Sequence, residues 1–167
     1  SVSEGAVAGW TQTSATCTDG SPVSAIALAA GETVTCTFTN TKDATVIVQK
    51  NTTGGDGTFE FTSTGANGLP TNFNVTSSSG TGSQTYTVTP GVQYSISETV
   101  PSGWSLTSSS CTSGSPASFT PSAGGTVTCT FTNTKDATLT LVKTVINDNG
   151  GTAVANDFQG KIDGGNV

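Results

Sequence analysis

Three polar side chains that can react with one another occupy positions that the sequence pattern turns toward a hydrophobic interior. They are Lys50, Glu98 and Asn133, and each continues a row of apolar residues at alternate positions. In a β-strand, alternate side chains point to the same face. The apolar residues of the three rows are Val46 and Val48, then Tyr94 and Ile96, then Val127, Cys129 and Phe131.

A buried ammonium or carboxylate without a partner costs several kcal/mol, so we expect the three groups to meet. In an apolar pocket the Lys50 amine is pushed toward its neutral, nucleophilic form and Glu98 toward its protonated form. Glu98 can then shuttle protons while the amine attacks the Asn133 carboxamide and ammonia leaves. The product is an intramolecular isopeptide bond. The alternative is a Lys50–Glu98 pair at a strand end, with the lysine reaching solvent and Asn133 making turn hydrogen bonds.

The composition excludes several other classes of function. The 167 residues carry a net charge of −6, only 10% are charged, and there is no histidine. Clustered basic residues for nucleic acid, an apolar run long enough for a membrane span and a glycine loop for phosphate are all missing. We therefore expect no metal site, no cofactor and no enzyme acting on external substrates. The only catalysis expected is the autocatalytic bond.

An internal repeat organises the chain. Thr33–Thr45 reads TVTCTFTNTKDAT and recurs unchanged at Thr126–Thr138, an offset of about 93 residues. Ser3–Trp10 likewise resembles Ser97–Trp104. We expect a cut-out from a longer exported polymer, with these parts: 1–42, the C-terminal part of one repeat; 43–135, a complete repeat; and 136–167, the N-terminal strands of a third.

The partial repeats carry incomplete copies of the reactive set. Glu4 and Asn40 match Glu98 and Asn133, and Lys143 matches Lys50. Neighbouring repeats of the same polymer are therefore the expected partners. Self-assembly by strand donation, with Lys143 of one molecule bonded to Asn40 of another, is the second possibility.

The strand signals predict an all-β fold. Several short segments alternate apolar residues with threonine or serine, which is typical of half-buried strands. Glycine- and serine-rich stretches at 51–57 and 77–82 separate them as turns. Residues 25–30 could form one short helical turn. Short strands spaced by turns predict Ig-like β-sandwich repeats, one complete and two partial.

The four cysteines fall into two similarly spaced pairs, Cys17 with Cys36 and Cys111 with Cys129. Zinc sites use closer spacing or histidine partners, so two local disulfides in an oxidising compartment are the better interpretation. Each would close a loop of roughly 18 residues, worth on the order of 3 kcal/mol in the chain-entropy model. Four buried free thiols are the alternative.

The order of the motifs resembles a known family. A first-strand Lys50 is followed by YSISETVPSGW at Tyr94–Trp104 and by Asn133 in CTFTN. This resembles the prealbumin-like, or collagen-adhesin B-type (SpaA-like), repeat domains of bacterial surface proteins and pilins. The resemblance implies a Lys50–Asn133 isopeptide bond with Glu98 as catalyst. Two features depart from the pattern: the paired cysteines, and Val7 where the second repeat has Pro101.

The repeats and their crosslinks predict a mechanical function. We expect a segment of an extracellular stalk or filament at the cell surface or in a secreted fibre, because covalent ties between first and last strands resist tension. The alternative is an adhesin module whose sandwich loops bind a host protein or a carbohydrate. An adhesive tip should carry a long, aromatic-rich loop, whereas only 7% of this chain is aromatic.

Overall fold

The computed structural model describes residues 1–64, 66–162 and 165–166, and its regular structure is almost entirely β-strand. Its internal contacts divide the chain into two units, Ser1–Asp136 and Ala137–Val167, and we describe each by itself. The strands of the first unit are β1 (Trp10–Cys17), β2 (Cys36–Lys42), β3 (Ala44–Thr53), β4 (Thr58–Ser63), β5 (Asn72–Thr76), β6 (Thr81–Val88), β7 (Ile96–Thr99), β8 (Trp104–Cys111) and β9 (Thr126–Lys135).

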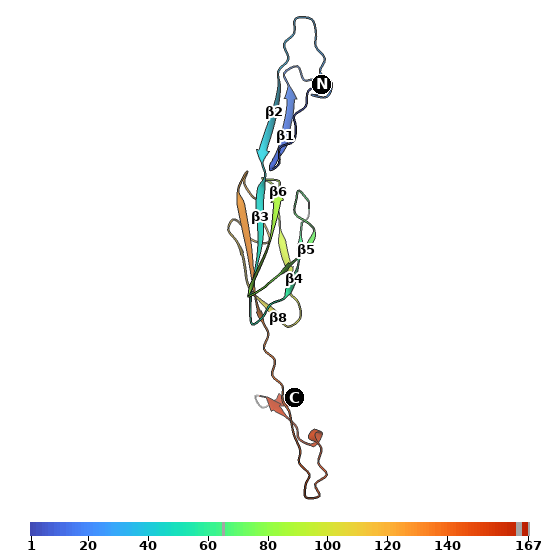
Figure 1. Cartoon of the computed structure of the whole chain (residues 1–167), viewed down its shortest axis with the longest axis vertical. Helices are drawn as coiled ribbons and strands as arrows, with labels where there is room; N and C mark the ends of the chain where they lie inside the picture. The colour runs from blue at the N-terminus through green and yellow to red at the C-terminus, as the bar shows by residue number, and fades with distance from the viewer. Residues whose placement is uncertain (65, 163–164, 167) are drawn as a thin grey trace. The chain divides into compact units, whose positions relative to one another are not determined.

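Strands β3 to β9 form a two-layered β-sandwich, residues 44–135 (Figure 1). One sheet has the strand order β6-β3-β9-β8 and the other has β5-β4-β7. Their facing sides bury a single hydrophobic core, which confirms the predicted all-β sandwich fold. The core residues are Ala44, Val46, Val48, Phe59, Phe61, Leu69, Val75, Val88, Tyr94, Ile96, Phe119, Val127, Cys129 and Phe131.

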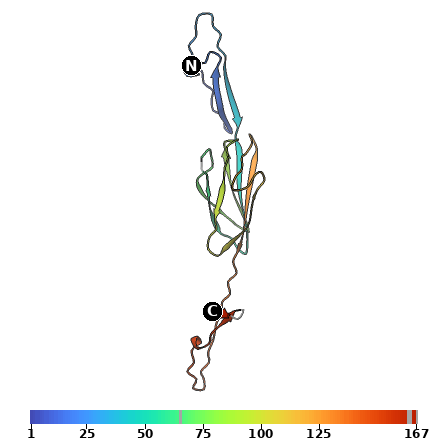
Figure 2. The ribbon, with the colours of Figure 1, turned by 180° about the vertical axis from the view of Figure 1, so that it is seen from behind.

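The first and last strands of the sandwich are neighbours in its larger sheet. β3 and β9 run parallel, with partners from Thr45↔Thr126 to Thr53↔Thr134. Figure 2 shows them side by side, β3 in cyan and β9 in orange. On its other edge β3 pairs antiparallel with β6. The two ends of the sandwich sequence therefore meet along one ladder of hydrogen bonds.

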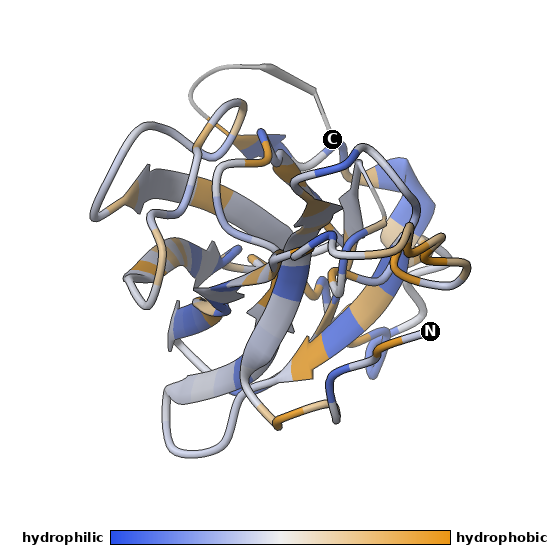
Figure 3. Ribbon diagram, turned by 90° about the horizontal axis from the view of Figure 1, so that it is seen from above, coloured by the Kyte–Doolittle hydropathy of each residue, from blue (hydrophilic) through white to orange (hydrophobic). Residues whose placement is uncertain are grey.

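Alternation along β3 decides what this strand buries. Val46, Val48 and Lys50 are each 0% exposed, while the residues between them are half-buried. Figure 3 shows the same alternation of hydrophobic and hydrophilic residues along several strands. The pleat places every second residue on the core face, whatever its polarity. This is why a lysine comes to lie in an apolar interior.

Residues 1–42, here called the N-terminal hairpin, form a smaller sheet from β1 and β2. The pairing runs from Cys17↔Cys36 to Trp10↔Lys42 and has the same register as β8 with β9. The matching sequences explain the matching registers. Residues 25–30, for which the sequence allows one short helical turn, form no helix.

The second unit contains a 3₁₀ helix, η1 (Ala155–Asp157), and two short strands, β10 (Lys161–Ile162) and β11 (Gly165–Asn166). Residues 138–145 match the start of β3 in sequence, but no strand forms over them. Throughout the described ranges, no helix has the length and apolar character needed to cross a membrane.

Candidate functional site: a buried lysine, glutamate and asparagine

Lys50 lies near the end of β3, with its side chain wholly inside the sandwich. In the ladder between β3 and β9 its backbone partner is Phe131, so the side chain needs to reach only a short way along β9 to meet Asn133. The Lys50 Nζ donates a hydrogen bond to Asn133 Oδ1, and a longer one of 3.4 Å to the Phe131 carbonyl oxygen. Asn133 is itself 0% exposed.

Glu98 reaches the same point from the opposite sheet, where it belongs to β7. One carboxylate oxygen, Oε2, lies 3.1 Å from Lys50 Nζ. The other, Oε1, accepts a hydrogen bond of 2.6 Å from Asn133 Nδ2. One carboxylate therefore touches both the amine and the amide nitrogen, as a proton shuttle between the two would have to do.

Burial lowers the pKa of Lys50 below its usual value of 10.5, and this desolvation outweighs the opposing effect of Glu98. A lowered pKa increases the fraction of neutral amine, which is the nucleophilic form. The Phe59 ring lies under the amine, with its centroid 4.3 Å from Nζ. Trp104 packs edge-on against Phe59 at 5.1 Å, so two aromatic rings shield this side of the site from water.

A surface depression adjoins the glutamate. It is lined by Glu98 together with apolar residues from both sheets and from the loop before β9, among them Ile96, Leu106, Pro116 and Phe131. The three polar groups are buried, but this depression brings solvent close to the Glu98 side of the site. It offers a short exit for a small molecule released there.

The N-terminal hairpin reproduces two of the three groups. Asn40 Nδ2 donates to both carboxylate oxygens of Glu4, each at 2.8 Å, but in the hairpin these side chains are exposed. Lys143, the third member of the incomplete set, belongs to the second unit, and its Nζ lies 4.2 Å from the centroid of the Phe158 ring.

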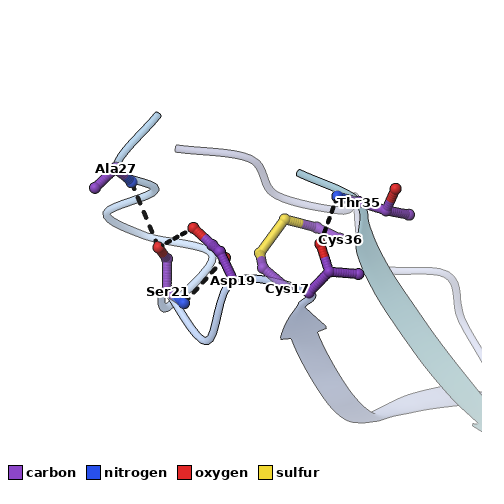
Figure 4. Close-up of a disulfide and its surroundings, with 7 residues drawn as sticks. Cys17, Asp19, Ser21, Ala27, Thr35 and Cys36 are labelled. Atoms are coloured by element: carbon purple, nitrogen blue, oxygen red, sulfur yellow. Dashed lines mark hydrogen bonds between the residues drawn. A yellow bond between two sulfur atoms is a disulfide. The ribbon is translucent and has the colours of Figure 1, made fainter. Parts of the chain in front are cut away.

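Both predicted disulfides are present, Cys17–Cys36 and Cys111–Cys129. Each joins the last residue of one strand to the residue paired with it on the next strand of its hairpin. Figure 4 shows the first of the two, Cys17–Cys36. Beside the first disulfide, the Thr35 backbone N–H donates a hydrogen bond of 3.1 Å to Thr18 Oγ1. The second has the equivalent bond, from Thr128 to Thr112 at 3.0 Å.

Sequence reasoning missed a β-bulge beside the site. The register of β8 shifts between Leu106 and Ser108, next to the pair Leu106↔Asn133. The extra residue is Thr107, whose Oγ1 donates 3.0 Å to the Thr132 carbonyl oxygen. A signal was present: Trp104 and Cys111 both contact the core, yet they are an odd number of positions apart. A regular strand would send them to opposite faces, so one inserted residue is required.

A second bulge lies at the matching place in the hairpin, between Gln12 and Ser14. It forms there although no opposing sheet covers β1 or β2 in the described part of the chain. The bulge is therefore a local property of the hairpin sequence.

Comparison with known families gives a match that covers more than half of the chain. A family profile described as a prealbumin-like fold domain matches residues 46–135, which is nearly the whole sandwich. The chain belongs to the prealbumin-like fold family. A second profile with the same description matches residues 1–38 and 134–166. The family resemblance expected from the motifs is thus confirmed, and prealbumin-like sequence extends on both sides of the sandwich.

Two solved structures similar to this prealbumin-like chain are major pilins of Streptococcus pyogenes. The T-13 pilin is 14% identical, with a TM-score of 0.36, and the match covers 59% of this chain and 48% of the pilin. The T3.2 pilin is 16% identical, with a TM-score of 0.37, and the match covers 80% of this chain and 65% of the pilin. The chain thus spans about half to two thirds of the length of these pilins. The comparison with curated proteins gave no match.

Proposed function

We propose that this chain is a structural segment of an extracellular stalk or pilus-like filament at the cell surface. Neighbouring repeats of the same polymer are its partners. Membership of the prealbumin-like family, the repeated sequence and the disulfides support a surface structural role of this kind. Disulfides persist in oxidising, extracellular surroundings, which agrees with the proposed location.

The sandwich is, in this proposal, closed by an isopeptide bond between Lys50 and Asn133. The single observation that carries it is the contact of one buried carboxylate, Glu98, with both the Lys50 amine and the Asn133 amide nitrogen. A buried lysine paired only for stability gains little, because desolvation offsets the attraction. A covalent amide removes both charges from the interior and keeps the strands joined.

The reaction needs no external reagent. Glu98 Oε2 accepts a proton from Lys50 Nζ, and the neutral amine attacks Asn133 Cγ to form the new C–N bond. Glu98 Oε1 then delivers a proton to Asn133 Nδ2 as the bond from Cγ to Nδ2 breaks. Ammonia leaves, and the depression beside Glu98 provides the exit. The Lys50 nitrogen also gives its second surplus proton to Glu98, which ends as a neutral carboxylic acid. One N–H remains on the new amide, so atoms and charges balance.

The position of this bond determines which residues would carry load. Tension enters the sandwich at Ala44, the start of β3, and leaves at Lys135, the end of β9. A Lys50–Asn133 bond would transmit this tension directly from β3 to β9. Residues 51–132, with the Cys111–Cys129 disulfide, would then lie outside the loaded path. The disulfide would stabilise the fold without bearing the tension.

The spacing between successive reactive residues fits a continuous covalent line. Asn40 precedes Lys50 by ten positions, and Asn133 precedes Lys143 by ten. Ten extended residues span about 33 Å. If every repeat were bonded, the filament would bear load through one such segment and one isopeptide bond per repeat.

Intact mass under denaturing conditions tests the bond. The chain should weigh one ammonia less than its sequence with two disulfides. Trypsin provides the location, because the chain lacks arginine and has lysines only at 42, 50, 135, 143 and 161. An acylated Lys50 resists cleavage, so the bonded domain should appear as a single fragment, 43–135. An unbonded domain should yield fragments 43–50 and 51–135.

Two variants serve as controls. Asn133→Ala removes the acceptor, and Glu98→Gln keeps a polar side chain of the same size but cannot exchange the proton. Both should show the unmodified mass and cleavage after Lys50. If the native chain has its full mass and is cleaved after Lys50, the isopeptide proposal is wrong. Loss of ammonia that persists in Asn133→Ala would point to another asparagine.

A further inference from the structure

We propose that residues 54–57, the loop between β3 and β4, form a strap that covers the reactive end of the sandwich, and that Asp56 holds this strap in place. Asp56 is then a positioning residue for the lysine–asparagine reaction, because the strap packs against the Phe59 ring under the Lys50 amine. The inference deepens the proposed function and rests on it for the reaction that the strap serves. The strap itself is testable whether or not the bond forms.

The strap begins beside the reactive residues. β3 ends soon after Lys50, and β9 ends at Lys135, soon after Asn133. Gly54 follows β3 directly and lies so close to the end of β9 that an added Cβ would come within 3.2 Å of Lys135 Cβ. Its φ of +88° also favours glycine, because residues with a side chain rarely adopt that backbone conformation. The strap therefore passes the end of β9 on its way from β3 to β4.

At its other end the strap contacts the aromatic side chains that shield the lysine. A Cβ added to Gly57 would lie 3.3 Å from Phe59 Cε2 and Cζ and 3.3 Å from Trp104 Cζ2, so the glycine packs directly against both rings. The Phe59 ring lies under the amine, with its centroid 4.3 Å from Lys50 Nζ. A single aromatic ring therefore separates the strap from the amine. If the strap moved away, water would reach the ring edges and the site behind them.

Asp56 supplies the side chain that anchors the strap. The strap reads Gly-Gly-Asp-Gly, so no other side chain is available to hold it. Asp56 Oδ2 accepts a hydrogen bond of 2.8 Å from the Ser79 backbone N–H, and Oδ1 accepts one of 2.8 Å from the Gly80 backbone N–H. Both donors belong to the turn between β5 and β6. A glycine-rich loop is conformationally free, so this anchor decides where the strap lies.

The turn that receives Asp56 is itself fixed to the end of the sandwich. The Gly80 carbonyl oxygen accepts a hydrogen bond of 2.8 Å from the Thr52 N–H of β3. Ser77, which precedes the turn and is 3% exposed, accepts 3.0 Å from the Gly57 N–H with its Oγ. The Ser77 N–H donates 2.9 Å to the Gly57 carbonyl oxygen in return. Strap and turn thus hold each other at two points, Asp56 and Gly57.

Backbone donors, and not an ion pair, hold the Asp56 carboxylate. The hydrogen bonds from Gly80 and Ser79 lower the pKa of Asp56 below its ordinary value of 3.8, so it is ionised at neutral pH. Lys135 is a cation that lies along the strap, but no ion pair joins it to Asp56 among the residues that the structure describes. Removing the carboxylate should therefore release the strap.

Release of the strap should raise the pKa of Lys50, because the burial that lowers it would be partly lost. Each unit by which this pKa rises reduces the neutral, reactive amine roughly tenfold at neutral pH. Loss of a nearby negative charge has the opposite effect, since it removes a group that favours the charged amine. The sign of the pKa change therefore distinguishes release of the strap from a simple change in charge.

The first test measures the Lys50 pKa by an NMR titration of its side chain in the full-length Asn133→Ala chain, where the amine stays free. Adding Asp56→Ala should raise this pKa toward 10.5. Adding Glu60→Ala is the matched control, because Glu60 is an exposed carboxylate of the neighbouring β4, and the pKa should then stay as it was. Glu98, the carboxylate that faces Lys50, is present in every variant. A role in stability alone would leave the pKa of the folded protein unchanged.

The second test follows the bond itself in the chain that keeps Asn133. The chain is made by cell-free synthesis, samples are quenched in denaturant at intervals, and trypsin reports the ratio of fragment 43–135 to fragment 51–135. Asp56→Ala should form the bond more slowly, by roughly tenfold for each unit of pKa gained in the first test. Glu60→Ala should form it at the native rate.

A second variant disturbs the strap without touching the carboxylate. Gly57→Ala places a Cβ against the Phe59 and Trp104 rings and should push the strap outward while Asp56 remains. It should also raise the Lys50 pKa and slow the bond. This variant decides the question if Asp56→Ala does not fold.

The outcomes separate this inference from the proposed function. A Lys50 pKa that rises in Asp56→Ala and Gly57→Ala, but not in Glu60→Ala, supports the strap. A pKa that is unchanged or lower in the first two overturns the strap and leaves the proposed bond intact wherever fragment 43–135 still forms. If the native chain never yields that fragment, the proposed bond is wrong, and the titration, carried out on the native chain, still decides the strap.

Discussion

The closing half of the sandwich and the N-terminal hairpin have nearly the same sequence but very different surroundings. Thr126–Thr138 repeats Thr33–Thr45 residue for residue. Yet Thr126–Thr128 belongs to β9, whereas the strand β2 begins only at Cys36. Asn133 is buried and Asn40 is exposed. Strand pairing, disulfide, bulge and glutamate–asparagine contact are common to both, so they are local. Burial of the asparagine and its contact with a lysine require β3 and the second sheet.

The largest expected difference is mechanical. In the native chain we expect the sandwich not to unfold under tension, because the proposed bond carries the load past its core. Asn133→Ala should make the sandwich as dependent on non-covalent contacts as the hairpin is. Because the Cys111–Cys129 disulfide keeps its loop closed, unfolding should then release a contour length on the order of 250 Å. Single-molecule stretching measures this length, and an unfolding step of that size in the native chain would contradict the prediction.

The second-largest expected difference between the sandwich and the N-terminal hairpin is their response to the loss of a disulfide. Each closes a loop of roughly 18 residues, worth about 3 kcal/mol in the chain-entropy model. Cys17→Ser with Cys36→Ser should abolish amide protection in β1 and β2, since an isolated two-stranded hairpin is marginal in water. The paired change Cys111→Ser with Cys129→Ser should leave β8 and β9 protected. Hydrogen exchange compares the two, and equal losses would mean that the sandwich is not independently stabilised.

The pH dependence of stability should distinguish bonded from unbonded sandwiches. In Asn133→Ala the Lys50 amine remains free, and its burial keeps its pKa below 10.5 in the folded state. Between that lowered pKa and 10.5 the unfolded chain binds more protons, so stability should rise as pH rises through this window. The native chain should lack this slope, because an amide nitrogen does not titrate. Urea unfolding at several pH values measures it, and equal slopes would mean that Lys50 is free in both proteins.

The smallest effect concerns a contact that both regions share. Ser105 Oγ donates 2.7 Å to Asp136 Oδ1, and Thr11 Oγ1 donates 2.6 Å to Asp43 Oδ1. These hydrogen bonds are exposed, so each contributes about 1 kcal/mol or less. Asp136→Ala should slightly increase exchange at the start of β8, and Asp43→Ala should do so at the start of β1. A much larger increase in exchange would mean that these aspartates stabilise more of each hairpin than the start of one strand.

Much of the fold followed from the sequence, because its signals are local. Alternation of apolar and polar residues identified the main strands, and these predicted the all-β sandwich. The inward parity of Lys50, Glu98 and Asn133 indicated that they would meet, and the structure places them in contact. The Phe59 ring beneath the lysine could not be foreseen, since β4 lies in the other sheet and nothing local links the two residues. The only sequence signal for the bulge was the odd number of positions between Trp104 and Cys111.

By itself the sequence determined the hairpins, their disulfides, their bulges and the pairing of a glutamate with an asparagine, because the N-terminal hairpin forms all of these contacts without a second sheet. Only the tertiary structure decided that β3 lies parallel to β9 and that an opposing sheet covers both. Residues separated by most of the repeat meet in this way, and the meeting removes water from the lysine. Desolvation depends on everything that surrounds a side chain, and for that reason identical sequences give an exposed amide in one region and a buried, lysine-bound amide in the other.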